Sequence, residues 1–217
     1  MRALAAEAAG SFLLFATVVG SGIMGEQLAE GNLAVALLAN AVATGAILYV
    51  LITVLGPLSG AHFNPAVSLV MALMRRIEAR RALAYAAVQV VGGIAGVWAA
   101  HAMFDLPILQ LSAHVRTGAG QWLGEAVATA GLILTILGAV RFAPDRVAAC
   151  VGLYITAGYW FTSSTSFANP AITLARALTD TFAGIAPADV PLFIAAQLAG
   201  ALAALALGRG LFGIGQP

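Results

Sequence analysis

The stretch "SFANPAITLAR", residues 166–176, places an asparagine, a proline and an arginine between two strongly apolar segments. A near copy, "GAHFNPAVSLV", occupies residues 60–70. Asparagine is a favoured N-cap and proline is favoured at the first helical position, so each Asn-Pro-Ala triplet predicts a helix start. The apolar pieces that follow, 64–74 and 169–178, would be about 15 Å long, half of a ~30 Å hydrocarbon core. A single Asn-Pro could be only a turn signal, but two at matching places indicate paired half-helices.

The composition is that of an integral membrane protein. Of the 217 residues, 61% are hydrophobic and 9% are charged, whereas soluble domains carry about 25% charged residues. The net charge of +1 gives no electrostatic basis for binding nucleic acid. The single cysteine, Cys150, excludes an internal disulfide and a multi-cysteine metal site, and no cofactor is expected. Residues 3–25 are interpreted as a retained first span because Glu7 and the length do not suit a signal peptide.

Six segments are apolar and long enough to cross a bilayer, which takes about 20 residues each. They are 3–25, 33–55, 82–103, 121–140, 147–164 and 190–208. Alternate joints then fall on opposite sides of the membrane. One side holds eight of the ten basic residues, namely Arg2, Arg75, Arg76, Arg80, Arg81, Arg141, Arg146 and Arg209, and the other holds Arg116 and Arg176. The positive-inside rule therefore predicts a multi-pass protein of the plasma (inner) membrane with both termini in the cytoplasm.

The chain is expected to be one domain, 1–217, built from two internal repeats at about 1–104 and 119–210. Each repeat runs from a glutamate (Glu7 or Glu125) through Asn-Pro-Ala to a Gln-x-x-Gly motif, which starts at Gln89 or Gln197. Three spans per repeat is an odd number, so the second repeat must be inverted relative to the first. Inverted repeats with broken helices place the solute path near the middle of the membrane.

The inverted repeat predicts that the two half-helices meet with their N-termini facing each other. Each N-terminus carries about half an elementary positive charge, which repels cations at this depth. The amides of Asn64 and Asn169 would donate hydrogen bonds to a passing solute. The loops before them would offer backbone carbonyls along the pore, from Gly60, Ala61, His62, Ser166, Phe167 and Ala168. A small neutral hydroxylated solute could exchange its water for these groups, whereas an ion could not do so cheaply.

With these motifs the chain resembles the aquaporin and aquaglyceroporin family over essentially its whole length. The residues that carry the resemblance are "SGAHFNPAVSL" (59–69), "SFANPAITLA" (166–175), the two glutamates and the two Gln-x-x-Gly motifs. The resemblance implies an all-α membrane fold of six transmembrane helices plus two re-entrant half-helices. It implies pore motifs at Asn64, Pro65, Ala66, Asn169, Pro170 and Ala171. It also implies a homotetramer in which each subunit has its own pore.

The chain departs from the family at the outer constriction. Water-selective members have an arginine three residues after the second asparagine, and here that position is Ile172. Arg176 is one turn further along the helix and is expected in the outer vestibule. By counting from the two asparagines, the other filter positions are Thr44, Ala157 with Gly158 beside it, and Ser166. These residues predict a wide, uncharged ring whose proton exclusion depends on the midplane dipoles.

The prediction for function is a passive channel for small uncharged solutes such as glycerol or trihydroxylated arsenic(III), with water. Around residues 169–187, the chain also resembles bacterial aquaglyceroporins tied to arsenic resistance. A water-selective pore and a secondary carrier with alternating access are the alternatives. No paired aspartates and no serine with a placed histidine are found, so an enzyme is not expected.

Three ionisable residues have competing interpretations. Glu7 and Glu125 are expected to accept backbone N–H bonds from the loops that carry the half-helices, although they could instead lie at the interface in a first helical turn. His62 is expected to anchor its loop; a metal ligand or a pH gate is the less favoured alternative.

Overall fold

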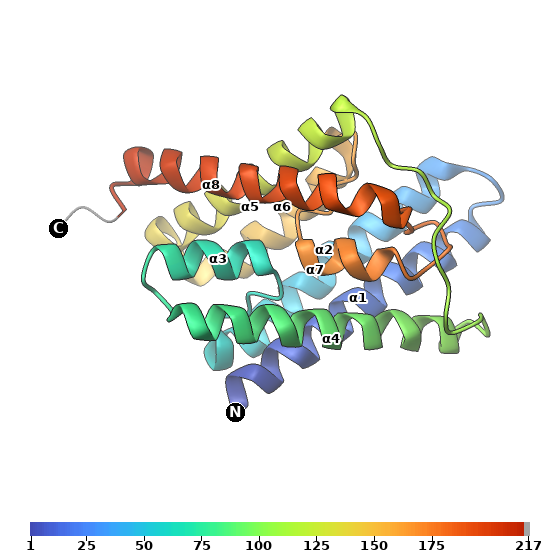
Figure 1. Ribbon diagram of the computed structural model, residues 1–217, viewed down its shortest axis with the longest axis horizontal. Helices are drawn as coiled ribbons and strands as arrows, with labels where there is room; N and C mark the ends of the chain where they lie inside the picture. Colours follow the sequence, from blue (N-terminus) through green and yellow to red (C-terminus); the bar gives the residue numbers. More distant parts are fainter. Residues whose placement is uncertain (215–217) are drawn as a thin grey trace.

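The computed structural model describes residues 1–214 of the chain and folds them into a bundle of long helices around two short ones (Figure 1). The long helices are α1 (Arg2–Leu28), α2 (Leu33–Ser59), α4 (Ala79–Met103), α5 (Ala119–Phe142) and α8 (Val190–Phe212). The shorter ones are α3 (Pro65–Leu73), α6 (Val147–Phe161) and α7 (Pro170–Arg176), with 3-10 turns η1 (Pro144–Arg146) and η2 (Pro187–Asp189). The predicted all-helical membrane fold is confirmed.

Five of the six predicted spans are helices long and apolar enough to cross a membrane. The remaining one, predicted over 147–164, is a helix of 15 residues that ends at Phe161. With the turn η1 before it, this segment reaches about 28 Å, since an α-helix rises ~1.5 Å and a 3-10 helix ~2.0 Å per residue. This length is close to that of a ~30 Å hydrocarbon core, and the α-helix ends three residues before the predicted end.

The two half-helices begin where the sequence predicts and end slightly earlier. Asn64 Oδ1 accepts a hydrogen bond from Ala66 N at 2.8 Å, and Asn169 Oδ1 accepts one from Ala171 N at 3.0 Å. Each asparagine therefore caps its own helix, and proline occupies the first position. Figure 1 shows α3 and α7 end to end in the middle of the bundle, running away from each other.

The contacts between helices repeat in the two halves. α1 packs on α4 and α2 as α5 packs on α8 and α6, while α3 lies on α4 and α7 on α8. The helices approach closely at matching glycines: a Cβ on Gly92 would overlap the carbonyl oxygen of Ala8, and one on Gly200 would overlap that of Ala126. Small residues let membrane helices approach backbone to backbone. The start of α1 and the end of α8 lie toward the same end of the bundle, on the left of Figure 1.

Candidate functional site

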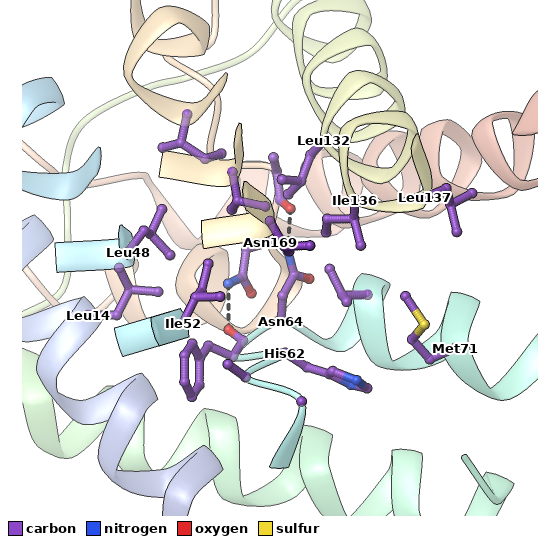
Figure 2. A pocket seen from close by; sticks show the side chains of 18 of the residues that line it. Leu14, Leu48, Ile52, His62, Asn64, Met71, Leu132, Ile136, Leu137 and Asn169 are labelled. Carbon is purple, nitrogen blue, oxygen red and sulfur yellow. Dashed lines mark hydrogen bonds between the residues drawn. The ribbon is translucent and has the colours of Figure 1, made fainter. Parts of the chain in front are cut away.

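A cavity of about 780 Å³ runs through the middle of the bundle, past the meeting point of the half-helices. One wall is apolar, and Figure 2 shows part of it: Leu14, Leu48, Ile52, Leu132 and Ile136. The other is formed by the loops before the two half-helices, with residues Gly60, Ala61, His62, Phe63, Asn64, Ser166, Phe167, Ala168 and Asn169. The cavity therefore offers a polar strip opposite an apolar surface along one path.

The two asparagines tie the two loops to each other within this polar wall (Figure 2). Asn64 Nδ2 donates to the carbonyl oxygen of Ala168 at 2.7 Å, and Asn169 Nδ2 donates to that of Phe63 at 2.8 Å. An amide NH₂ has two donors, so each asparagine keeps one N–H beyond the cross-loop bond. Both side chains are almost fully buried from the exterior and lie in the cavity wall.

Glu7 fixes the first loop by hydrogen bonds on the side away from the cavity. Its Oε1 accepts hydrogen bonds from Ser59 Oγ at 2.7 Å and from His62 N at 2.9 Å. Its Oε2 accepts from Phe63 N and from Gln89 Nε2, both at 2.7 Å. The carboxylate is fully buried, and a buried charge is tolerated when donors of this kind surround it.

Glu125 makes the equivalent bonds in the second half. It accepts from Phe167 N at 2.8 Å, from Ala168 N at 2.9 Å and from Gln197 Nε2. Gln197 also donates to the hydroxyl of Thr173 at 2.8 Å. Neither glutamate lies at the interface of a first helical turn, which was the alternative for these residues, because both are fully buried.

The two loops hold a strained backbone conformation at matching positions. One and three residues before each asparagine, φ is positive in a non-glycine residue: Ala61 (49°), Phe63 (45°), Ser166 (53°) and Ala168 (48°). Such a residue costs roughly 1–2 kcal/mol and persists only where its surroundings fix it. In residues 1–214, the carbonyl oxygens of the polar strip at 60–62 and 166–167 accept no hydrogen bond from the protein. The strained loops therefore leave these acceptors available to a solute.

Three of the four predicted filter residues lie in the cavity wall: Thr44, Ser166 and Ile172. The assignment of Ala157 is corrected, because this residue is on the exposed side of α6. Tyr159 takes its place in the wall, with its hydroxyl 3.1 Å from Thr44 Oγ1. The wall residue thus lies two residues from the position obtained by counting back from Asn169. The ring therefore includes a large aromatic residue, Tyr159, where the sequence predicted a small one, Ala157.

Arg176 lies in the cavity wall, one turn beyond Ile172 at the end of α7. Its guanidinium carbon is 3.3 Å from the centre of the Phe167 ring, and Nε donates to the carbonyl oxygen of Ala183. A second arginine, Arg116, also lies over this ring, at 5.2 Å. Burial lowers the pKa of Arg116, although a guanidinium stays protonated in proteins. The ring residues Thr44, Tyr159, Ser166 and Ile172 are uncharged, and Arg176 lies one turn beyond them, at the position the sequence analysis gave it.

Sequence reasoning missed Ser68 and Thr173, which each stand four residues after an asparagine and bond the glutamine of their half. The alignment of "NPAVSLV" with "NPAITLA" shows this hydroxyl in both repeats, so the signal was present. His62 Nδ1 lies 3.0 Å from Ser68 Oγ, and its ring contacts the edge of Tyr85. These contacts fit the anchoring role expected for His62.

The fold and the cavity define a polytopic membrane channel, and comparison with known proteins identifies the family. The model of the major intrinsic protein family matches residues 1–146. The chain is 59% identical to the aquaglyceroporin AqpS of Rhizobium meliloti (strain 1021), over 100% of this chain and 92% of the relative. It is 29% identical to aquaporin Z of Brucella melitensis biotype 1, over 98% and 99%. The chain belongs to the major intrinsic protein family, whose members are channels and not enzymes.

A solved structure agrees with the fold. The X-ray structure of the aquaglyceroporin from Plasmodium falciparum superposes with a TM-score of 0.76, covering 97% of this chain and 96% of that one. The identity in this comparison is 20%, so the likeness concerns the arrangement of the helices.

Proposed function

We propose that this protein is a passive channel for small uncharged hydroxylated solutes, with glycerol and trihydroxylated arsenic(III) as the solute class and water as a further permeant. The observation that carries the proposal is the two-sided cavity, with free backbone carbonyls facing an apolar wall. A polyol has the same two-sided character, because its hydroxyls lie along one edge of a hydrocarbon chain. The high identity to a relative named as an aquaglyceroporin supports the same solute class.

The polar strip supplies both donors and acceptors for such a solute. The spare N–H groups of Asn64 and Asn169 donate, and the carbonyls of both loops accept. An ion would lose its full hydration shell here for a few neutral dipoles, which disfavours its entry.

The protein is proposed to act as a homotetramer in the inner membrane, each subunit with its own pore and with both termini in the cytoplasm. This orientation is supported by the start of α1 and the end of α8, which lie at one end of the bundle, and by the arginines predicted on that side.

The function is tested by stopped-flow light scattering of proteoliposomes that contain the purified protein. Glycerol and water are expected to enter faster than in empty liposomes, with flux linear in the gradient and without saturation or counterflow. Arsenite uptake is measured in the same vesicles. Water entry without glycerol entry would instead assign a water-selective channel, and saturable flux with counterflow would assign a carrier.

Tyr159 is expected to set the width of the filter. Tyr159→Ala should raise the permeability of erythritol, a four-carbon polyol, relative to glycerol by about tenfold, which is ~1.4 kcal/mol of barrier. Tyr159→Phe removes the hydroxyl contact with Thr44 and keeps the ring, so it should stay close to wild type. Ala157→Val, on the exposed side of the same helix, is the matched control. An unchanged erythritol-to-glycerol ratio in Tyr159→Ala would place the narrowest point elsewhere.

A further inference from the structure

The long connection between α4 and α5, residues 104–118, is fastened to the segment that follows α7. Figure 1 shows this connection running along one end of the bundle, past the end of α7. Backbone N–H groups make these hydrogen bonds: Ser112 N to Ala177 O (3.0 Å), Ala186 N to His114 O (2.6 Å) and Arg116 N to Asp189 Oδ2 (2.7 Å). The connection therefore holds Arg116 beside the Phe167 ring and the segment that follows α7.

Arg116 and Arg176 are bound to the same short segment by alternate carbonyls. Arg116 Nε donates to Gly184 O at 2.7 Å, and its Nη2 donates to Phe182 O at 3.3 Å. Arg176 Nε donates to the carbonyl between them, that of Ala183. Because carbonyls are neutral, these bonds fix both guanidinium groups without cancelling their charge.

The carboxylates near the two arginines are used by backbone groups. Asp180 Oδ1 accepts from Ala113 N at 2.8 Å, and Asp189 accepts from the backbone of Arg116 and not from its side chain. Glu125 lies behind the loop and accepts its N–H groups. The Phe167 ring, with both guanidinium groups over it, stabilises positive charge through its π-electrons. Two fixed positive charges thus stand at this end of the cavity.

Arg176 is the one of the pair that reaches the permeation path. It lines the cavity while only 2% of its surface is exposed, and in residues 1–214 its guanidinium makes a single hydrogen bond to the protein, through Nε. We propose that Arg176, supported by Arg116 across the Phe167 ring, is the fixed positive charge of the outer filter, displaced one helical turn from position 172, and that it bars protons and cations from the pore. The midplane dipoles then form a second barrier and not the main one.

The proposal is tested by proton influx into proteoliposomes that carry a pH-sensitive dye, with glycerol flux measured in the same preparation. Arg176→Met keeps an apolar stem against the ring and removes the charge. Its proton influx is expected to rise by about tenfold or more, since a charge close to the path acts strongly in a low-dielectric pore. Arg176→Lys should stay near wild type, and Arg116→Met should show a smaller rise. Arg209→Met, an exposed arginine at the end of α8, is the control and should change nothing.

The proposal is overturned if Arg176→Met carries glycerol and conducts protons no faster than wild type, or if the wild type itself leaks protons. If Arg176→Met carries no solute, Arg116→Met decides, because Arg116 is outside the cavity wall: an unchanged proton influx overturns the proposal. The proposed barrier to protons and cations depends on the pore and does not require glycerol to be the solute that permeates it. A wild type that excludes both glycerol and protons would contradict the proposed solute class and leave the barrier standing.

Discussion

Glu125→Ala is expected to abolish glycerol flux and to lower the thermal stability of the detergent-solubilised protein. The substitution orphans the N–H groups of Phe167 and Ala168 and removes one of the two hydrogen bonds that the Gln197 amide donates. Each buried donor left without a partner costs about 1–3 kcal/mol. The loop also contains two non-glycine residues with positive φ, Ser166 and Ala168, and would relax once these bonds are lost. The measurements are stopped-flow glycerol entry and a thermal unfolding curve.

Glu26→Ala, an exposed glutamate near the end of α1, is the matched control and should leave both readouts unchanged. Glu125→Gln keeps one carbonyl oxygen as an acceptor but brings an NH₂ group toward the loop donors, so an intermediate loss is expected. Full glycerol flux with an unchanged unfolding temperature in Glu125→Ala would show that the loop holds its shape without the carboxylate.

The second large effect is expected from a single added methyl group. In Gly200→Ala the new Cβ would overlap the carbonyl oxygen of Ala126, so α8 would have to move away from α5. Overpacking of this kind costs about 1–3 kcal/mol, and more where the obstacle is backbone. We expect a lower unfolding temperature and reduced yield of folded protein in size-exclusion chromatography. Gly92→Ala should behave alike, because its Cβ would overlap Ala8 in the same way.

Gly56→Ala is the control for this pair. Gly56 lies inside α2 with no atom within 4 Å of its added Cβ, so alanine should be neutral or stabilising by about 0.5–1 kcal/mol. Equal stability in Gly56→Ala and Gly200→Ala would mean that the α5–α8 contact tolerates separation.

The parts of the site that repeat in the sequence were predictable from it. The half-helices, Glu7 and Glu125 were found because each occurs twice at matching positions, and a local rule for helix starts applies to both copies. Their hydrogen bonds in the structure follow the same repeat. Where local chemistry and the inverted repeat agree, a sequence of this kind is informative about which groups face each other.

The parts that depend on tertiary context were not predictable. Tyr159 was missed because packing on α2 and α5 decides which face of α6 lines the cavity, and this face holds Val151, Ile155 and Tyr159. Arg116 was missed because a connection without periodicity brings it to the Phe167 ring through backbone bonds. The charge at the outer filter comes from this connection and from the end of α7, outside the position that the motif specifies.

The bonds between the two asparagines and the opposite loops have a consequence for biosynthesis. Asn64 needs Ala168, and Asn169 needs Phe63, so each re-entrant loop is completed by a residue about a hundred positions away. When only the first repeat has been synthesised and inserted into the bilayer, the pore is incomplete. An incomplete translation product should therefore leave the membrane sealed, and permeability should appear abruptly once the second loop has been released and docked.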